Sequence, residues 1–258
     1  MIQGQNANDL VSIITPAYNC ECFIEDMFRS VQRQTYTNWE LLITEDHSQD
    51  GTWERLCRFA EEEPRLKLFR TKCNCGAANA RNVSISHAKG RYIAYLDADD
   101  MWIPNKLEKQ ICFMQHNSVP MCYAGIETVD KNGGHINYVH VPLKMGYKDF
   151  LANTLTASPV MVIDTELVDR DLLPMRPLPR EDLCAWLRIL KTGITAYGID
   201  EPLAKYRKHE DSSSANLVKM AGQTWYVYRK VEKLGFFFSL RCFVGYAYHA
   251  VRKRMREN

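Results

Sequence analysis

Residues 88–100 read AKGRYIAYLDADD, a short apolar run that ends in a cluster of carboxylates. The run Tyr92–Leu96 predicts a buried strand. Carboxylates this close together repel one another unless a cation or hydrogen-bond donors offset their charge. A divalent metal with oxygen ligands, shared with substrate phosphates, is one such cation. A solvated acidic turn that caps the helix near Pro104 is the alternative. The carboxylates that end the stretch 88–100 are those of Asp97, Asp99 and Asp100.

Short β-branched runs alternate with helical patterns over the first 125 residues. This alternation is typical of a parallel sheet with crossover helices. We therefore predict an α/β fold, a Rossmann-like mixed sheet flanked by helices. The candidate strands are Leu10–Thr15, Glu40–Thr44, Leu66–Arg70, Tyr92–Leu96 and Met121–Gly125.

Polar residues follow the first, second and fourth predicted strands. In such sheets, ligands bind outside the carboxyl ends of the strands, so these residues are the candidates for chemistry. Three segments that are distant in the sequence should therefore converge on one rim. The segments are Pro16-Ala17-Tyr18-Asn19, Glu45-Asp46-His47-Ser48 and Asp97-Ala98-Asp99-Asp100.

The pattern changes beyond residue 125. Lys131–Gly134 predicts a hairpin turn between Met121–Thr128 and Ile136–Val141. The predicted helices are Tyr147–Thr154 and Leu183–Lys191. The strands that would extend the sheet as a mixed one are Val160–Ile163, Thr195–Ile199 and Leu203–Arg207.

A chain of 258 residues, 46% of them hydrophobic, can bury a sizeable core. We expect one main domain, residues 1–222, followed by a tail, residues 223–258. The net charge of +2 is too small to indicate nucleic acid as a partner, but its distribution is uneven. Residues 229–258 hold eight Lys/Arg against two Glu and carry +6, so the other residues carry −4.

The first nine residues are polar and lack the basic segment of a secretory signal. No apolar run approaches the roughly 20 residues of a membrane span. We therefore expect a cytosolic chain whose nine cysteines are reduced thiols. The pairs Cys20/Cys22 and Cys73/Cys75 leave open a non-catalytic, zinc-linked interaction module, although paired zinc ligands are usually further apart.

A stripe of apolar residues runs along the tail at helical spacing. Together with a basic end, Arg252–Arg256, it suits an interfacial helix that is attracted to anionic lipids. The alternative is that the stripe packs on the main domain and the cations only stabilise the end of the helix. The stripe consists of Phe236, Leu240, Phe243, Ala247 and Val251.

Five stretches of the sequence, together with their order along the chain, resemble glycosyltransferase family 2. The resemblance implies a GT-A fold, a UDP-sugar donor and a divalent metal, Mn²⁺ or Mg²⁺. It also implies that residues 1–125 bind the nucleotide sugar and residues 126–222 bind the acceptor. The stretches are VSIITPAYN (11–19), SVQRQTY (30–36), EDHSQDGT (45–52), GAANARN (76–82) and AKGRYIAYLDADD (88–100).

The resemblance assigns the donor to the predicted rim. The nucleotide base would stack on Tyr18, and Asp46 would accept the uracil N–H. Asp99 is the expected metal ligand, and Asp97 would contact ribose or sugar hydroxyls and share the metal. The family usually has Asp-Asp after the second strand, whereas this chain has Glu45-Asp46, so no role is carried over to Glu45. The expected nucleotide-sugar-binding residues are Pro16, Tyr18, Asn19, Asp46, Arg81, Asp97 and Ala98.

Arg81 follows Gly76 on a helix whose N-terminus should point at the rim, which suits a residue that holds donor groups. A surface arginine is the alternative. Arg207 and His209 lie in a Tyr-Arg-x-His segment with following serines, Ser212–Ser214, that resembles the family. They would stabilise the departing diphosphate, unless the segment is a loop of solvated charges.

The resemblance places the catalytic base at Asp182 of the pair Glu181-Asp182. Inverting transfer needs one carboxylate near the acceptor hydroxyl to remove its proton as the bond forms. The alternative is that Asp182 is simply a helix N-cap, preceded by Glu181.

Over nearly its whole length, the chain is similar to bacterial enzymes of teichuronic acid and O-antigen assembly. This implies transfer of glucose or galactose from a UDP-hexose to GlcNAc- or GalNAc-diphosphate-undecaprenol, on the inner face of the cell membrane, in the synthesis of O-antigen, capsule or teichuronic acid. A polyprenyl-phosphate sugar synthase is the alternative enzyme. The Gln-x-x-Arg-Trp motif of processive members is absent, so we expect single-sugar addition.

Overall fold

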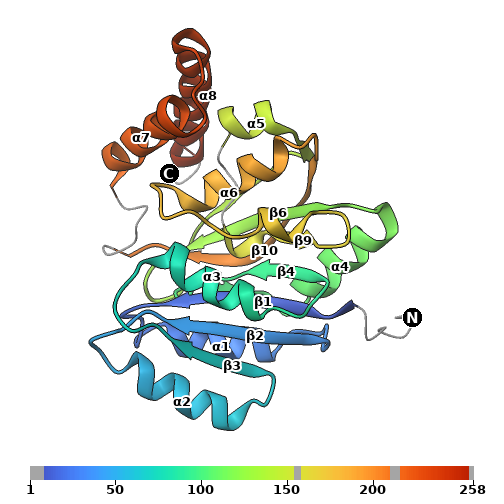
Figure 1. Cartoon of the computed structure of the whole chain (residues 1–258), viewed down its shortest axis with the longest axis vertical. Coiled ribbons are helices and arrows are strands. Elements are labelled where there is room, and N and C mark those ends of the chain that lie inside the picture. Colours follow the sequence, from blue (N-terminus) through green and yellow to red (C-terminus); the bar gives the residue numbers. More distant parts are fainter. Residues whose placement is uncertain (1–8, 154–157, 210–215, 256–258) are drawn as a thin grey trace.

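The computed structural model describes residues 9–153, 158–209 and 216–255, with side chains to residue 250 (Figure 1). The predicted helix end at Thr154 and the serines Ser212–Ser214 lie outside these residues. The strands are β1 (Val11–Ala17), β2 (Trp39–Glu45), β3 (Leu66–Arg70), β4 (Tyr92–Tyr95), β5 (Met101–Trp102), β6 (Met121–Val129), β7 (His135–Val139), β8 (Lys144–Met145), β9 (Val162–Asp164) and β10 (Ala196–Arg207). The α-helices are α1 (Ile24–Gln32), α2 (Thr52–Glu62), α3 (Ala77–His87), α4 (Lys106–Asn117), α5 (Tyr147–Ala152), α6 (Glu181–Leu190), α7 (Leu217–Tyr226) and α8 (Phe236–Met255).

One mixed sheet runs through the molecule in the order β3-β2-β1-β4-β9-β6-β10-β5. The first four of these strands are parallel, and β9 is antiparallel to both of its neighbours. Since β10 is parallel to β6, the strands β1, β2, β4, β6 and β10 all end at the same rim. The predicted α/β class and mixed sheet are confirmed.

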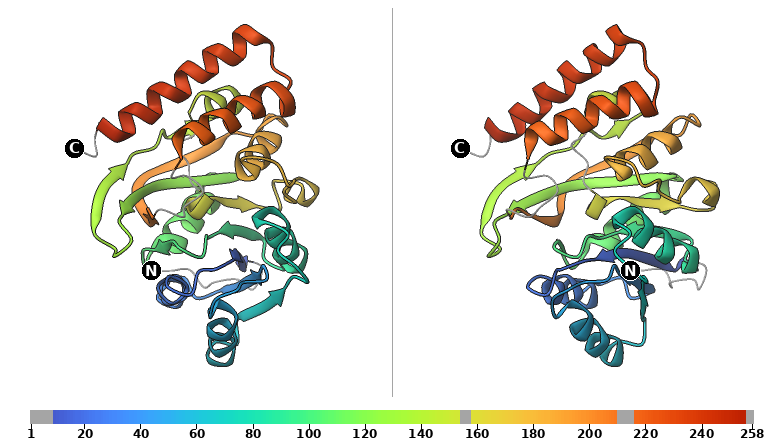
Figure 2. Two further views of the ribbon diagram at one scale, coloured as in Figure 1. Left: turned by 90° about the vertical axis from the view of Figure 1, so that its left-hand side faces the viewer. Right: turned by 60° about the vertical axis from the view of Figure 1, so that its left-hand side comes forward.

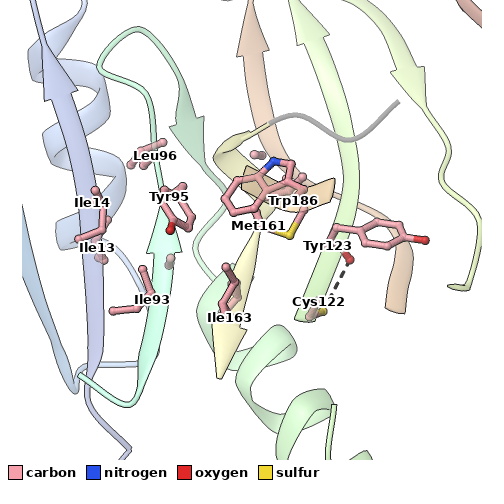
Figure 3. Packing of buried hydrophobic residues seen from close by; sticks show 14 of the residues in the cluster. Ile13, Ile14, Ile93, Tyr95, Leu96, Cys122, Tyr123, Met161, Ile163 and Trp186 are labelled. Carbon is pink, nitrogen blue, oxygen red and sulfur yellow. Dashed lines mark hydrogen bonds between the residues drawn. The ribbon is translucent and has the colours of Figure 1, made fainter. Parts of the chain in front are cut away.

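The central strands read as continuous apolar runs because both faces of the sheet are covered. Figure 2 shows α1 on one side of the sheet and α3 on the other. Between them, β1, β2 and β4 are buried almost throughout. On the far side of β4, the Trp186 ring of α6 meets the Tyr95 ring edge-on at 4.9 Å (Figure 3). This contact anchors α6 beside the end of β4.

The second half of the sheet is confirmed with one correction. The hairpin β6–β7 forms with Gly133 at a φ of 87° in its turn, as Lys131–Gly134 predicts. The two strands predicted at Thr195–Ile199 and Leu203–Arg207 are instead one strand, β10. Its register against β6 shifts on both sides of Pro202. Because proline lacks the N–H of a ladder residue, Pro202 marks an irregularity here rather than the end of a strand.

The tail is a pair of helices, α7 and α8, joined by the π-helical turn η4 (Val227–Val231). It lies over α5 and α6, at the end of the molecule away from β3 (Figure 1). The predicted stripe begins at Phe236, the first residue of α8, but most of its described members are exposed rather than packed on the domain. Val251 lies beyond the described side chains. Among the described residues, no helix is both long and apolar enough to cross a bilayer.

Candidate functional site

The predicted site residues gather at the rim where the parallel strands end. Pro16 is the next-to-last residue of β1, Asp46 follows β2, Asp97 comes soon after β4, and Arg207 ends β10. Glu181 begins α6, the helix anchored by Trp186. Four of these segments come together because their strands share one direction, and the fifth is the start of a helix that packs beside β4.

Arg81 is the link between the two acidic segments of the rim. Its Nη2 lies 2.6 Å from Asp97 Oδ1, and its Nη1 lies 2.9 Å from Glu181 Oε1. Arg81 is buried, so the alternative of a surface arginine is wrong. Burial alone would lower the pKa of the guanidinium, but the carboxylates of Asp97 and Glu181 raise it. One charged side chain thus fixes the β4 turn relative to the start of α6.

Asp99 and His209 are neighbours at the more open part of the rim. His209 Nε2 lies 3.0 Å from Asp99 Oδ2, and both side chains are partly exposed. The ring of Phe23, 4.9 Å away, packs against the imidazole. The pair presents one carboxylate oxygen and one ring nitrogen, which are donor types that manganese accepts.

Arg207 holds the acidic turn through hydrogen bonds to Asp99 and Asp100. Its backbone N–H donates to Asp100 Oδ1 at 2.8 Å, and its Nε donates to the carbonyl of Asp99 at 3.0 Å. The remaining guanidinium donors bond to the carbonyl of Lys131 and, at 2.7 Å, to Asp26. Arg207 is only 4% exposed, so its guanidinium faces protein acceptors. The sequence pattern did not indicate Asp26 as its partner.

The acidic turn holds more negative charge than its protein contacts offset. Burial raises the pKa of Asp97, which Arg81 opposes and Asp99 increases. Burial, with the charges of Asp99 and Asp97, raises the pKa of Asp100 well above its ordinary value. In addition, Asp100 Oδ2 is buried and has no hydrogen-bond partner among the described residues. The residues present therefore fit a divalent cation, which would relieve this repulsion.

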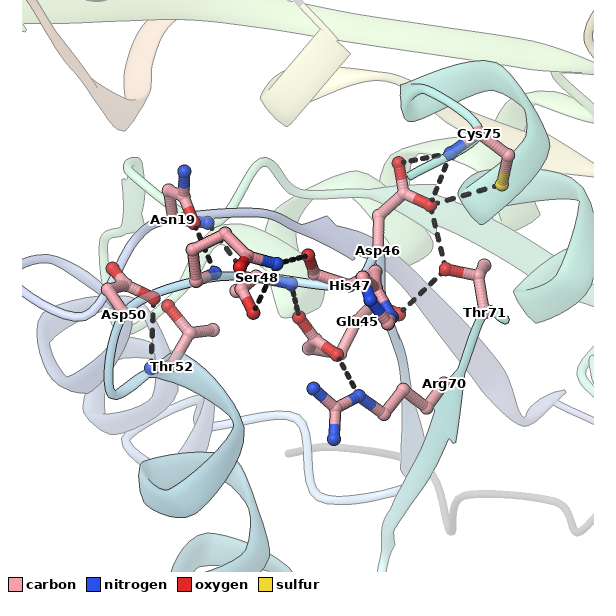
Figure 4. A network of polar contacts seen from close by, with 11 residues as sticks. Asn19, Glu45, Asp46, His47, Ser48, Asp50, Thr52, Arg70, Thr71 and Cys75 are labelled. Carbon is pink, nitrogen blue, oxygen red and sulfur yellow. Dashed lines mark hydrogen bonds and ion pairs between the residues drawn. The ribbon is translucent and has the colours of Figure 1, made fainter. Parts of the chain in front are cut away.

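Asp46 is tied into the loop that precedes α3, as Figure 4 shows. Its carboxylate accepts hydrogen bonds from the Thr71 hydroxyl at 2.9 Å and from the backbone N–H groups of Cys75 and Gly76 at 3.0 and 2.7 Å. Although burial acts in the opposite direction, these donors lower the pKa of Asp46. Since Asp46 is buried, a uracil N–H would have to share the carboxylate with them.

The loops after β1 and β2 are clasped together. The Asn19 N–H donates to Ser48 Oγ at 3.0 Å, and Asn19 Oδ1 accepts from the Gln49 N–H at 2.9 Å (Figure 4). Asn19 has a φ of 45°, in the left-handed region that asparagine tolerates. Tyr18 is exposed beside this clasp, whereas Ala98 is buried. The ring of Tyr18 is therefore the free aromatic surface at this end of the rim.

Glu181 and Asp182 are the first two residues of α6, and the N-cap is Arg180, in the left-handed region. The alternative in which Asp182 caps the helix is therefore wrong. Asp182 Oδ2 accepts from Ser158 Oγ at 3.2 Å, and its carboxylate lies at the positive end of the helix dipole. Nothing in the sequence pattern singled out Ser158, which precedes β9.

The described cysteines are all free thiols. Within the described residues, no group of three or more His, Cys, Asp and Glu side chains is arranged to hold a metal ion. Burial raises the pKa of Cys20 to about 12 and that of Cys75 to about 11, which opposes the thiolate form that binds zinc. At the acidic turn, the protein would supply only part of a metal's ligands and leave the rest to substrate phosphates.

Comparisons with known proteins agree on one family. Residues 12–173 match the family described as Glycosyl transferase family 2. The chain is 41% identical over 251 residues to TuaG of Bacillus subtilis, named for teichuronic acid biosynthesis, covering 97% of this chain and 99% of the relative. It is 38% identical over 217 residues to WfgD of Escherichia coli, named as a UDP-Glc:α-D-GlcNAc-diphosphoundecaprenol β-1,3-glucosyltransferase, covering 84% of each chain.

Solved structures share the fold at low sequence identity. One is the mannosyltransferase PcManGT of Pyrobaculum calidifontis in complex with GDP-Man and Mn²⁺, with a TM-score of 0.71, 20% identity, and coverage of 93% of this chain and 69% of that one. Another is S. aureus TarS 1–349 in complex with UDP-GlcNAc, with a TM-score of 0.69, 18% identity, and coverage of 93% and 71%.

Proposed function

The chain belongs to glycosyltransferase family 2 and has a GT-A fold, and from this premise we propose that it transfers one hexose from a UDP-sugar to a lipid-diphosphate-linked sugar, with inversion. The donor is glucose- or galactose-linked UDP, and the acceptor is GlcNAc- or GalNAc-diphosphate-undecaprenol. The product enters a bacterial surface polysaccharide of the O-antigen, capsule or teichuronic acid kind. Support for the acceptor comes from WfgD of E. coli, whose name gives GlcNAc-diphosphoundecaprenol as its acceptor.

We assign the donor to residues 1–125. The exposed ring of Tyr18 offers a stacking surface for the base beside Pro16 and Asn19. Asp46 orders the loop before α3 and accepts the base N–H through the same carboxylate. Asp97, held by Arg81, faces ribose and sugar hydroxyls, next to Ala98 in the turn.

We assign Mn²⁺ or Mg²⁺ to Asp99, with Asp97 beside it. His209, 3.0 Å from the Asp99 carboxylate, either adds a ligand or donates to the departing diphosphate. When bound, the metal neutralises the negative charge that grows on the departing UDP. Arg207 acts as a positioning residue because its guanidinium holds the carbonyl of Asp99.

We assign the acceptor to residues 126–222 and the general base to Asp182. Its carboxylate would remove the proton from the attacking hydroxyl as the new glycosidic bond forms. Ser158 and the helix N-terminus orient it, and Glu181 is fixed by Arg81. The tail, predicted from residue 223, corresponds to the α7–α8 pair, which already begins at Leu217. A peripheral position on the inner face of the cell membrane would suit a lipid-linked acceptor.

One observation carries the proposal: the buried Arg81 joins Asp97 of the acidic turn to Glu181 at the start of α6. It would hold the donor and the base at a fixed separation, as a direct displacement needs. The test incubates the protein and Mn²⁺ with a panel of UDP-sugars and a short-chain lipid-diphosphate-GlcNAc or -GalNAc acceptor, and follows UDP release and the glycosylated product.

The expected result is transfer to the sugar hydroxyl, lost in Asp182→Asn. Transfer to polyprenyl phosphate that persists in Asp182→Asn would overturn the assignment in favour of a polyprenyl-phosphate sugar synthase, because a phosphate acceptor has little need of a base. Tightly held zinc in a protein without transferase activity would favour a zinc-linked module.

A further inference from the structure

Helix α8 packs on the domain through a face that mixes small and aromatic side chains. The residues turned toward the domain include Ser239 and Cys242, which are almost fully buried, together with Tyr246. A Cβ added to Gly245 would come within 3.0 Å of the Ala152 Cβ in α5, so the helices approach closely at that point. Glycine allows this close contact, while the larger rings of Phe238 and Phe243 pack against the core, partly buried.

The opposite face of α8 also carries large apolar side chains. Phe237, Leu240, Val244 and Tyr248 recur at a helical spacing of three and four residues, so they form one stripe. Phe237 is 84% exposed, and Val244 and Tyr248 are each 60% exposed. We call this stripe the α8 outer face. A surface helix whose outer side is in water usually carries polar residues on that side.

Exposed apolar side chains are concentrated in the tail. Of the twelve exposed large hydrophobic residues among the described part of the chain, eight lie on α7 and α8. Monomeric soluble proteins rarely expose contiguous apolar surface of this kind unless it binds something. Four of these eight residues form the α8 outer face. The other four are Phe236 of α8 and Leu217, Val218 and Tyr226 of α7.

The exposed charges of residues 216–250 are of one sign. Glu232 is the only acidic residue in the stretch 216–250, and it is buried against Lys191 and Tyr147. The sequence continues with basic residues beyond the described side chains, at positions 252–254 and 256. The exposed cations of the stretch are Lys219, Lys230, Lys233 and Arg241.

We propose that the α8 outer face, with these cations, docks the protein on the anionic phospholipid surface of a bilayer. Apolar and aromatic side chains beside lysine and arginine match such an interface, where the rings enter the headgroup region and the cations are attracted to anionic lipid. A second copy of the chain fits less well, because a two-fold interface would oppose the same cations on both sides.

The docking surface is connected to the acceptor side of the site. Arg180, the N-cap of α6, donates to Thr224 Oγ1 of α7 at 3.0 Å. The helix that begins with Glu181 and Asp182 is thereby joined to the helices that would touch the lipid. This step rests on the proposed function. A protein docked through the α8 outer face would present the end of α6 that carries Asp182 to an acceptor whose lipid lies in the same membrane.

The test measures co-sedimentation of the full chain with vesicles of phosphatidylcholine alone and with added phosphatidylglycerol. Wild type should bind the anionic vesicles and release them in high salt. The double variant Phe237→Gln/Val244→Gln should bind about tenfold more weakly or worse, since it removes apolar area that enters the bilayer. Lys230→Gln/Arg241→Gln should lose the preference for phosphatidylglycerol.

Leu143→Gln/Leu167→Gln is the matched control, because it replaces two exposed leucines outside the tail and should bind like wild type. Equal vesicle binding by wild type and Phe237→Gln/Val244→Gln would overturn the proposal. So would a dimer in sedimentation equilibrium that this variant dissociates, since a second copy would then cover the face.

Vesicle binding is read without any sugar transfer, so its outcome is separate from that of the proposed function. If wild type binds vesicles but transfers no sugar, the docking surface stands and the reaction assignment fails. If both hold, Phe237→Gln/Val244→Gln should keep its activity on a short-chain acceptor in solution and lose it on a long-chain acceptor in vesicles.

Discussion

The two acidic groups at the rim are held in different ways. The turn after β4 is fixed from several sides, by Arg81 on Asp97 and by Arg207 on Asp99 and Asp100. Among the described residues, the carboxylate of Asp182 accepts one hydrogen bond from another segment, from the hydroxyl of Ser158 at 3.2 Å. A group that holds a metal and a diphosphate gains from a rigid frame, whereas a base must approach a hydroxyl and then carry its proton.

The largest expected effect comes from replacing Asp182, the carboxylate with the fewer contacts of the two groups. Asp182→Asn keeps the size of the side chain but cannot accept a proton, so kcat should fall by about 10²–10⁴-fold. Binding of UDP with Mn²⁺ should stay at the wild-type level in calorimetry. Asp171→Asn, which changes an exposed aspartate away from the rim, is the control. Wild-type kcat in Asp182→Asn would remove this residue from the reaction.

A substitution in the acidic turn after β4 should change donor binding as well as turnover. Asp99→Asn weakens the metal site, so Mn²⁺-dependent binding of UDP should be lost and kcat/KM should fall by about 10²–10³-fold. Chelation of wild type with EDTA should reproduce this loss, and circular dichroism should show an intact fold. If Asp99→Asn still responds to Mn²⁺ as wild type does, the metal is held elsewhere.

Arg81→Lys tests the connection between the two sides. A lysine keeps the charge but not the two-pronged guanidinium, so it cannot hold Asp97 and Glu181 together. We expect kcat to fall by about 10–100-fold, the scale of misplaced reacting groups, with a smaller change in KM. Arg91→Lys is a matched control, because Arg91 also grips a carboxylate, Asp164, but at the other end of β4. An equal loss of kcat in both variants would mean that only general stability is affected.

The sequence predicted the part of the fold that depends on local pattern. The strand Leu66–Arg70 has the predicted bounds, and the apolar run before Asp97 is β4, one residue shorter than predicted. The sequence could not predict that β10 continues through Pro202, because this depends on how β10 pairs with β6. The pairing continues past Pro202 with a shift in register. Such an accommodation depends on a neighbour that lies 70 or more residues away along the chain.

At the candidate site, the sequence indicated which segments would meet but not how each side chain would be used. The prediction that Arg81 faces the rim agrees with its contacts, whereas its bridge to Glu181 joins positions that are distant along the chain. Arg207 was expected to face the diphosphate, and the structure turns its guanidinium toward Asp26 and the carbonyls of Asp99 and Lys131. Motif spacing carries no information on such pairings.

The smallest expected effect probes why the acidic turn is rigid. The pKa of Asp100 is raised, chiefly by burial and then by Asp99 and Asp97, so the folded chain favours the protonated form. Its contribution to stability is then present below the unfolded pKa of about 4 and is lost as pH rises through the higher folded pKa. Asp100→Asn resembles the protonated form and keeps an oxygen for the Arg207 N–H.

We therefore expect metal-free Asp100→Asn to unfold at a slightly higher urea concentration than wild type at neutral pH and at a similar one in acid. Adding Mn²⁺ with UDP should narrow the gap, because a cation offsets the same repulsion in wild type. Parallel pH curves for the two proteins would show that Asp100 is not under electrostatic strain. In that case the rigidity of the turn would come from Arg81 and Arg207 alone, and the contrast with Asp182 would be one of hydrogen bonding rather than charge.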